Sequence, residues 1–403
     1  MAFLFGAVAF VVALLASVML HEGGHLLTAK RFGMKATQYF VGFGPTLWSR
    51  RRGETEYGVK AIPLGGFVKI VGYTPLEEID EADRPRAFYR QPAGRRAIVI
   101  GAGVAANFAF AFVLLMVMAM AVGVRVPGSA STTVDQVSAC VPATLQDVCE
   151  RGRPPSPAKE AGLRAGDRVV SFGGTRVRTW AGLRAAIAAA PPGRPVQVVV
   201  ERPSGPGGAA GPVTLTVRPA RVAGETFLGM SAKVTGQGYE RVGPLNATVF
   251  AARGVGTAVA GIGRALAGLP AAIPRLFSPD RGSTPGGQVG SVVGATDVSG
   301  QIFSSHSSGR DKIALFLSLV VSVNIFLGAL NVVPLLPLDG GHLAVVAYER
   351  ARARIARLRG RPDPGTVDMT RLLPITYLAV LVLVGFGVLL ILADLVNPLR
   401  LPQ

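Results

Sequence analysis

The chain has 403 residues, of which 49% are hydrophobic and only 16% are charged, and its mean hydropathy is +0.41. A soluble domain usually carries about 25% charged residues, so this composition excludes an ordinary soluble protein and indicates a membrane protein with a soluble part. The net charge is +18, but no module that combines aromatic and basic residues indicates nucleic-acid binding. Anionic lipid at the cytoplasmic face is the expected partner of the basic charge.

Four uncharged stretches are long enough to cross a bilayer as helices. They are Phe3–Leu20, Ala97–Val124, Ile313–Leu338 and Leu372–Ala393. Residues 30–96 contain 13 Lys and Arg and residues 349–371 contain seven, whereas residues 125–311 contain only 20 in 187. Short loops rich in Lys and Arg stay in the cytoplasm. The expected topology therefore has the N-terminus and residues 125–311 outside and both basic loops inside, with no cleavage of the first helix as a signal peptide.

The first predicted span runs directly into His21-Glu22-Gly23-Gly24-His25. Two histidines four residues apart share one face of a helix and can bind one zinc ion, and the glutamate beside the first can handle the proton of an attacking water. Ionisable groups at a membrane span are costly unless they have a partner or a function. We therefore expect His21 and His25 to bind Zn²⁺ and Glu22 to be catalytic, with this site near the cytoplasmic end of the span.

Residues 36–72 are unusually apolar for a cytoplasmic loop. Thr37–Leu47 and Tyr57–Val71 are typical of strands and are separated by the polar stretch Ser49–Glu56. Four glycines punctuate them: Gly42, Gly44, Gly65 and Gly66. From the residues alone we expect a small hairpin packed under the bundle. A sheet that dips toward the membrane, with an edge that could add an extended peptide, is the alternative. Residues 74–96 are expected to be a surface linker, and Asn107 in the second span needs a polar partner.

The segment between the second and third spans changes character at residues 134–219. An A-G-L-x-x-G-D run within Ser156–Asp167 is typical of bacterial PDZ domains that accompany proteases. It is followed by an expected strand, helix and two further strands: Arg168–Phe172, Trp180–Ala190, Val196–Glu201 and Val213–Val217. We interpret this segment as a PDZ domain, with another small α/β barrel as the alternative. Pro203–Gly211 is expected to be a flexible hairpin loop.

Two smaller features complete this outer segment. Cys140 and Cys149 are too few for a metal cluster; a local disulfide is expected outside the cytosol, although two free thiols remain an alternative. Residues 243–277 are apolar and glycine-rich, with Arg253, Arg264 and Arg275 at intervals of eleven. One basic stripe indicates a helix lying in the membrane interface rather than a fifth span, ended or kinked by its prolines, Pro270 and Pro274. Residues 278–311 are expected to be a loop.

The third predicted span ends in a stretch that cannot continue an ordinary helix, N-x-x-P-x-x-P-L-D-G-G-H over residues 331–342. By the expected topology, Asp339 reaches the same membrane depth as His21 and His25. A catalytic zinc takes three protein ligands and keeps one open position, so Asp339 is the expected third ligand. His342 is the rival third ligand. A second helix over Leu343–Leu358 is expected along the cytoplasmic surface.

These motifs together resemble the site-2 protease family. The resemblance rests on H-E-x-x-H in a first span, a G-x-G loop, P-L-G-G-F-V-K over Pro63–Lys69, a PDZ domain and N-x-x-P-x-x-P-L-D-G-G, and it covers nearly the whole chain. More closely, the chain is similar to the bacterial branch that cleaves membrane-embedded anti-sigma factors. One departure is Gly103-Val-Ala-Ala-Asn107 in the second span, which lacks the proline often found in G-P-x-x-N. The resemblance therefore does not extend to a gate that depends on that proline.

The resemblance implies roles for particular residues and partners. Asp339 would be the third zinc ligand, Asn331 would hold the substrate backbone, and the sheet would present the substrate as an added strand. The implied substrate-binding residues are Asn331, Gly42, Gly44, Gly65, Gly66 and Asn107. The PDZ domain would admit only single-span substrates already trimmed outside. From the residues alone, a PDZ-containing membrane scaffold with a structural zinc site is the main alternative, and a transporter is a weaker one because no inverted repeat is visible.

The sequence thus predicts an α-helical multi-pass membrane protein with four transmembrane helices, a membrane-associated β-sheet and an inserted extracytoplasmic α/β PDZ domain. The expected parts are, in order, the first transmembrane helix (1–30), a cytoplasmic-side loop with the sheet (31–96), the second helix (97–124), the PDZ domain (125–222), an interfacial segment (223–311), the third transmembrane segment (312–342), a cytoplasmic-side helix and loop (343–371) and the fourth helix (372–403).

Overall fold

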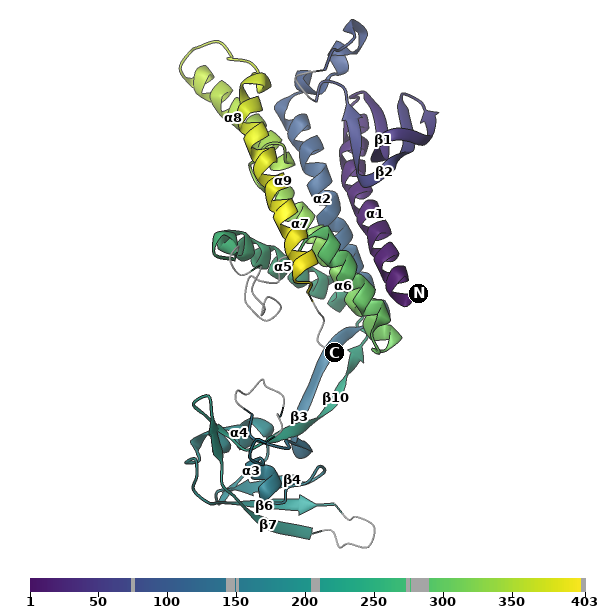
Figure 1. Ribbon diagram of the computed structural model, residues 1–403. Helices are drawn as coiled ribbons and strands as arrows, with labels where there is room; N and C mark the ends of the chain where they lie inside the picture. Colours follow the sequence, from purple (N-terminus) through teal and green to yellow (C-terminus); the bar gives the residue numbers. More distant parts are fainter. Residues whose placement is uncertain are drawn as a thin grey trace. The chain divides into compact units, whose positions relative to one another are not determined.

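The structure is a computed structural model that describes residues 1–73, 77–142, 149, 152–203, 211–272, 276 and 290–399. The chain forms two compact units. The first comprises Met1–Gly123 and Arg241–Gln403 and contains long helices and a small sheet; the second, Val124–Glu240, is built mainly of strands (Figure 1).

Long apolar helices dominate the first unit. Its elements in chain order are α1 (Ala2–Arg31), β1 (Ala36–Arg52), β2 (Thr55–Ile70), η1 (Glu81–Arg86), η2 (Phe88–Arg90), α2 (Ala93–Val117) continued by η3 (Met118–Val122), α5 (Pro244–Ala272), α6 (Val292–Ser304), α7 (Gly309–Val332), α8 (Asp339–Leu358), η5 (Met369–Leu372) and α9 (Leu373–Val396). Many apolar side chains on α1 and α9 are exposed, as expected of helices that face lipid. The chain is therefore a multi-pass membrane protein.

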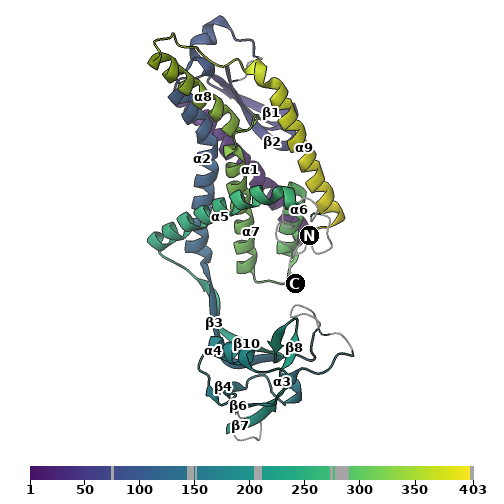
Figure 2. The same ribbon diagram turned by 90° about the vertical axis from the view of Figure 1, so that its left-hand side faces the viewer.

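Five helices in the described part of the chain are long and apolar enough to cross a membrane, by length and composition. They are Ala2–Arg31, Ala93–Val122, Pro244–Ala265, Gly309–Val332 and Met369–Val396. Four coincide with the predicted spans, and the fifth lies in α5. Figures 1 and 2 show α5 running across α1, α2 and α7 rather than along them. The helix continues past Pro270 to Ala272, whereas Pro274 and Arg275 lie outside the described residues.

The prediction of a loop over residues 278–311 is wrong where α6 forms. Small residues are what make this helix possible, because they let it approach α1 closely. A Cβ on Gly300 would lie 2.4 Å from the Phe3 ring, and Ser299 Oγ donates to the Gly6 carbonyl at 2.8 Å. Ser291 caps the helix by accepting from the next amides. The glycine and serine residues that indicated a loop therefore belong to a helix, where they allow close packing on α1.

The small sheet lies against α1 and pairs β1 with β2. Gln38–Val41 pair on one side with Lys69–Gly66 and on the other with Glu56–Val59, so residues 66–70 form an outer edge. Ser49–Arg52 belong to the strand, whereas a polar break was predicted there, because they pair with Gly58–Thr55 and the turn falls at Gly53. The predicted strands are therefore present but longer.

Residues 77–92 are attached to this sheet more firmly than a surface linker would be. Ala87 and Phe88 are buried, and Lys35 on the sheet side pairs with Asp83 at 2.6 Å. The hydrogen bonds from Arg86 lower the pKa of the Glu54 carboxyl. The segment therefore fastens the sheet to the start of α2, which begins at Ala93.

The second unit contains a six-stranded antiparallel sheet, a separate two-stranded sheet of β8 and β9, and short helices. Its elements are β3 (Val124–Val137), α3 (Pro157–Glu160), β4 (Arg168–Phe172), β5 (Thr175–Arg176), α4 (Trp180–Ala189), β6 (Val196–Arg202), β7 (Gly211–Val217), β8 (Ala220–Val222), β9 (Glu225–Phe227) and β10 (Met230–Glu240). The strand order is β10-β3-β4-β6-β7, with β5 beside β4. The predicted strands and helix over 168–217 are present. Of the predicted hairpin loop, only Pro203 and Gly211 lie within the described residues.

The A-G-L-x-x-G-D run has a clear structural role in this unit. Asp167 is fully buried and accepts hydrogen bonds from Arg202 Nε and Nη2, both at 2.8 Å, and from the Arg164 amide. The hydrogen bond to Asp167 raises the pKa of Arg202. Gly162 and Gly166 both have positive φ, which favours glycine. The motif therefore forms a turn that fastens the start of β4 to the end of β6.

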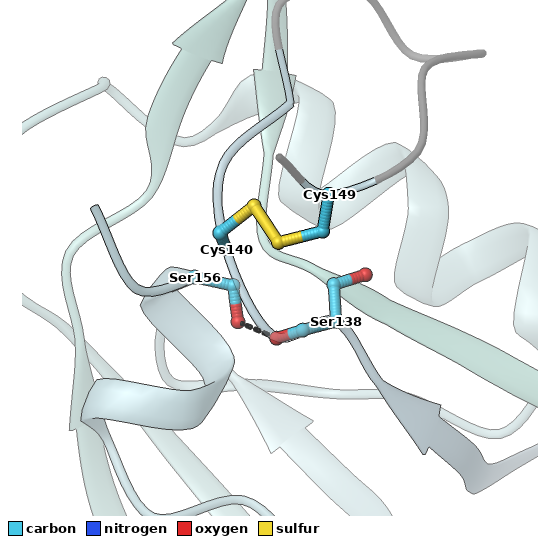
Figure 3. The surroundings of a disulfide bond; sticks show 4 residues. All are labelled: Ser138, Cys140, Cys149 and Ser156. Atoms are coloured by element: carbon cyan, nitrogen blue, oxygen red, sulfur yellow. Dashed lines mark hydrogen bonds between the residues drawn. A yellow bond between two sulfur atoms is a disulfide. The ribbon is translucent and has the colours of Figure 1, made fainter. Parts of the chain in front are cut away.

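A disulfide joins Cys140 to Cys149, as expected. Figure 3 shows it beside Ser156, the residue that caps α3 and donates from its hydroxyl to the Ser138 carbonyl at 2.6 Å. The backbone of Cys140 also forms an isolated antiparallel β-bridge with Pro155. The disulfide therefore holds Cys149 close to Cys140, beside the beginning of α3.

Candidate active site

Two histidines on the inner face of α1 begin the site. His21 and His25 are one helical turn apart and both are buried, with their Nε2 atoms 3.3 Å from each other. Ser17, one turn earlier on the same face, is also buried and accepts a hydrogen bond from the amide of Asn324 on α7 at 2.9 Å. The H-E-x-x-H spacing thus places both imidazoles toward the helix that leads to Asp339.

Asp339 is the first residue of α8, just after the chain turns away from the end of α7. The two glycines that follow it permit this turn. A Cβ on Gly340 would lie 2.3 Å from the carbonyl oxygens of Val332 and Val333, and one on Gly341 would lie 2.5 Å from the Leu336 nitrogen. The P-L-D-G-G stretch is therefore a close packing of the α8 start on the preceding loop, and that packing positions the Asp339 carboxylate.

The three side chains converge on one point. Asp339 Oδ2 lies 3.2 Å from His21 Nε2 and 3.3 Å from His25 Nε2, and these three are the metal-binding group found among the described residues. Zinc bonds of about 2.0–2.1 Å in a tetrahedron leave neighbouring ligand atoms about 3.3 Å apart. The observed triangle has that size. The donor set and its spacing therefore fit a zinc ion with one position left for water or substrate.

The outer nitrogens of both imidazoles are also engaged. His25 Nδ1 lies 2.8 Å from the Val99 carbonyl, and His21 Nδ1 lies 3.2 Å from the side-chain amide of Asn107. Zinc-bound histidines usually donate their other N–H in this way, which fixes the ring orientation. With the Asn107 amide turned so that its Oδ1 faces His21, that buried and otherwise unpartnered oxygen would accept a hydrogen bond from His21 Nδ1–H. Asn107, which was predicted to bind substrate, contacts a candidate metal ligand in the structure.

Gly103 on α2 makes room for the two rings. A Cβ there would lie 2.3 Å from His25 Nε2 and 2.9 Å from His21 Cε1. On α1, Gly24 allows the same close approach, because its Cβ would lie 2.4 Å from the Ala102 carbonyl oxygen. The glycines in H-E-G-G-H and G-V-A-A-N therefore let α1 and α2 touch at the metal centre.

Replacing Gly103 with Ala should weaken zinc binding, because the added methyl group displaces the imidazole that must bind the metal. We expect a loss of about 10–100-fold in affinity, the range found when ligand orientation is disturbed. Gly101→Ala on the same helix is the matched control, since a Cβ there meets nothing within 4 Å. Metal content after dialysis against graded chelator measures both variants. Equal zinc retention by the two would contradict this account of the site.

Glu22 joins the metal centre to the sheet edge. Its Oε2 accepts a hydrogen bond from the Val68 amide at 3.0 Å, and the half-buried carboxylate lies on the helix turn that carries both histidines. Tyr39 on β1 donates from its hydroxyl to the Met19 carbonyl at 2.6 Å, which fixes the sheet against α1. The outer edge of β2 therefore faces the candidate catalytic base.

His342, the rival third ligand, is placed differently. Its ring packs against that of Tyr73 at a tilt of 48°, with the ring centroids 5.0 Å apart, and it does not belong to the metal-binding group. Burial raises the pKa of the Tyr73 hydroxyl, so this residue stays neutral beside the imidazole. The geometry favours Asp339 over His342 as the third ligand.

The remaining predicted residues lie around the sheet and at the end of α7. Gly66 meets α1 directly, because its Cβ would lie 2.5 Å from Met19 Sδ. Gly42, Gly44 and Gly65 have positive φ and contact residues of the sheet itself, so they shape it rather than reach the metal ligands. Asn331 is half-buried in the last turn of α7, and its side chain makes no hydrogen bond within the described part of the chain.

Sequence reasoning missed three contributors to the site. Val99 and Val68 act through their backbone carbonyl and amide, and a backbone contact leaves no mark on residue type. Gly103 did stand in a noticed pattern, four residues before Asn107, and its glycine was the available signal. A glycine at this position indicates close packing between two helices, which the sequence analysis did not predict.

The fold and the site define a membrane-embedded metal-dependent peptidase of the H-E-x-x-H type. The model for peptidase family M50 matches residues 9–362. The zinc metalloproteases Rip1 of Mycobacterium tuberculosis and of Mycolicibacterium smegmatis are each 38% identical to the chain over 423 and 418 residues, covering 100% of both proteins. This chain belongs to peptidase family M50, the site-2 protease family, and is a zinc metalloprotease.

Proposed function

We propose that this zinc metalloprotease hydrolyses a peptide bond in or near the transmembrane segment of single-span membrane proteins. The observation that carries the proposal is that two of the three ligands, His21 and His25, lie on α1, a helix long and apolar enough to cross a membrane. A substrate helix hides its amides in i→i−4 hydrogen bonds. It must unwind before its carbonyl can be attacked, so the site needs groups that bind freed backbone.

Two features support such a backbone-binding role. The outer edge of residues 66–70 faces Glu22 and can pair with an extended segment. The Asn331 amide is without a hydrogen bond in the described part of the chain. We assign the edge and Asn331 to the substrate backbone, with Gly42, Gly44, Gly65 and Gly66 shaping the edge and Asn107 orienting His21.

The chemistry follows from the residues around the metal position. His21, His25 and Asp339 would hold Zn²⁺, which when bound acts as a Lewis acid that polarises the scissile carbonyl. Glu22 accepts the proton of the attacking water and delivers it to the leaving amine nitrogen. A scaffold with a structural zinc would need a fourth protein ligand, and the described residues supply three at this point. A catalytic site therefore explains the donor set better.

The proposed topology follows the basic loops. Four helices, α1, α2 with η3, α7 and α9, cross the bacterial plasma membrane, and α5 lies in the interface. The N-terminus and the second unit are extracytoplasmic, and the metal centre lies toward the cytoplasm. The disulfide in the second unit suits an oxidising compartment, and this compartment supports the assignment.

We interpret the second unit as a PDZ domain that restricts access to substrates already cut outside the membrane. Its antiparallel sheet, the helix α4 and the A-G-L-x-x-G-D turn support this interpretation. The proposed substrates are anti-sigma factors, which the resemblance to the anti-sigma-cleaving branch implies.

The test is a comparison of membrane fragments in cells that carry either the wild-type chain or Glu22→Gln. Cells with the variant should accumulate, about tenfold or more, single-span fragments that lack most of their extracytoplasmic part. Purified wild-type enzyme should cut the same fragments within or beside the span, as mass spectrometry of the products would show. Accumulation of soluble proteins alone, or cleavage sites far from any span, would reject the proposal.

A further inference from the structure

An open cavity of about 690 Å³ lies between the start of α2 and the side of α8, away from the metal centre. Four of its lining residues are arginines: Arg96, Arg350, Arg354 and Arg357. Two carboxylates, Glu349 and Asp363, also line it. The proteolytic chemistry makes no use of this concentration of guanidinium groups.

Three of the arginines form one face of α8. Arg350, Arg354 and Arg357 follow the i, i+4, i+7 spacing that places side chains on the same side of a helix. All three are exposed, and none makes an ion pair or hydrogen bond within the described part of the chain. Both carboxylates of the lining are already engaged. Asp363 accepts a hydrogen bond from the Gly365 amide, and Glu349 accepts hydrogen bonds from Arg96 and from the Val367 amide.

The buried end of the cavity has a donor without an acceptor. Arg96 is only 8% exposed and donates from Nη2 to Glu349 Oε2 at 2.5 Å. The other oxygen of Glu349 accepts from the Val367 amide at 2.7 Å, so this carboxylate is fully used. The Nε of Arg96 remains buried without a partner. A buried charged donor in this state is normally satisfied by a ligand or water.

The start of α2 adds further positive electrostatic potential to the cavity. Gln91 and Ala93 flank Pro92, the N-cap of this 25-residue helix, and line the cavity; Pro92 provides no side-chain cap. Free amides at a helix N-terminus favour anions. Planar guanidinium groups bind phosphate in bidentate fashion. Together these groups define a site for a phosphate group.

The neighbouring face of α8 indicates where that phosphate comes from. Tyr348, Ile355 and Leu358 follow one another at i, i+7 and i+10 and are 58%, 49% and 80% exposed. An apolar stripe beside arginines is typical of a helix in the membrane interface. We propose that this cavity binds the headgroup phosphate of an anionic phospholipid, with the acyl chains along the apolar stripe of α8.

The experiment titrates the purified full-length protein in detergent with short-chain phosphatidylglycerol, and in parallel with inorganic phosphate and with short-chain diacylglycerol. Bound ligand is counted by native mass spectrometry. The triple variant Arg350→Gln, Arg354→Gln, Arg357→Gln should bind phosphatidylglycerol about a hundredfold more weakly than the wild type, since each basic side chain near an anionic lipid contributes about a factor of five. The substituted residues are exposed, so the variant should fold.

The matched control removes the same charge elsewhere: Arg359→Gln, Arg361→Gln, Arg371→Gln, none of which lines the cavity. It should bind phosphatidylglycerol within about threefold of the wild type, because these side chains do not line the cavity and exposed charges that make no direct contact are largely screened. Inorganic phosphate binding with the same variant dependence and equal affinity would identify a soluble phosphate site and overturn the lipid assignment. Equal losses in both triples, or diacylglycerol binding as well as phosphatidylglycerol, would overturn the site itself. No substrate is involved, so failure here leaves the proteolytic proposal unaffected.

Discussion

Replacing Glu22 with Gln should reduce peptide hydrolysis by about 10²–10⁴-fold, the usual contribution of a positioned general base, while zinc content stays unchanged. The amide cannot accept the proton of the attacking water. It keeps the size of the side chain and an oxygen that can accept from the Val68 amide, so the sheet edge should stay in place. His21, His25 and Asp339 are untouched.

The measurement combines initial rates of cleavage of a purified single-span substrate with zinc stoichiometry of the same preparation. Glu54→Gln is a suitable control, because Glu54 lies on the surface and pairs with Arg86 rather than with any residue of the site. It should retain activity within about twofold. Loss of zinc from the Glu22 variant, or retention of more than about a tenth of wild-type activity, would show that Glu22 has a different role.

Much of this site could be predicted because its chemistry depends on side chains at fixed spacing. Two imidazoles four residues apart on a helix lie on the same face whatever surrounds them. The prolines before Asp339 indicate that the membrane-spanning helix ends there, at a membrane boundary. His25 and Asp339 are more than three hundred residues apart in the sequence. The distribution of Lys and Arg predicted the direction of each span, and these directions place both residues at the same membrane depth.

The parts that escaped prediction depend on contacts between backbones. The Val99 carbonyl that orients His25 and the Val68 amide that meets Glu22 could belong to any residue type. Helix α6 was missed for a related reason: its glycine and serine residues favour a loop in isolation, and only close packing on α1 offsets that preference. Asn107 was recognised as polar and in need of a partner, but sequence could not choose between a substrate and His21.

Replacing Asp339 with Ala should remove zinc and activity together, in contrast to Glu22→Gln. The carboxylate is the only anionic group of the ligand triangle, and its Oδ2 lies within 3.3 Å of both imidazole Nε2 atoms. Two neutral imidazoles alone provide an incomplete zinc site. The expected zinc content of the purified variant is less than about a tenth of the wild-type value, with no detectable cleavage.

His342→Ala provides the decisive comparison, because His342 is the other residue near the start of α8 that could bind a metal. Its ring packs against Tyr73 and lies outside the ligand triangle, so its loss should leave zinc content at the wild-type level. Zinc analysis of the two variants side by side separates the assignments. If His342→Ala lost the metal and Asp339→Ala kept it, the third ligand would be the imidazole, and the carboxylate beside His21 and His25 would need another explanation.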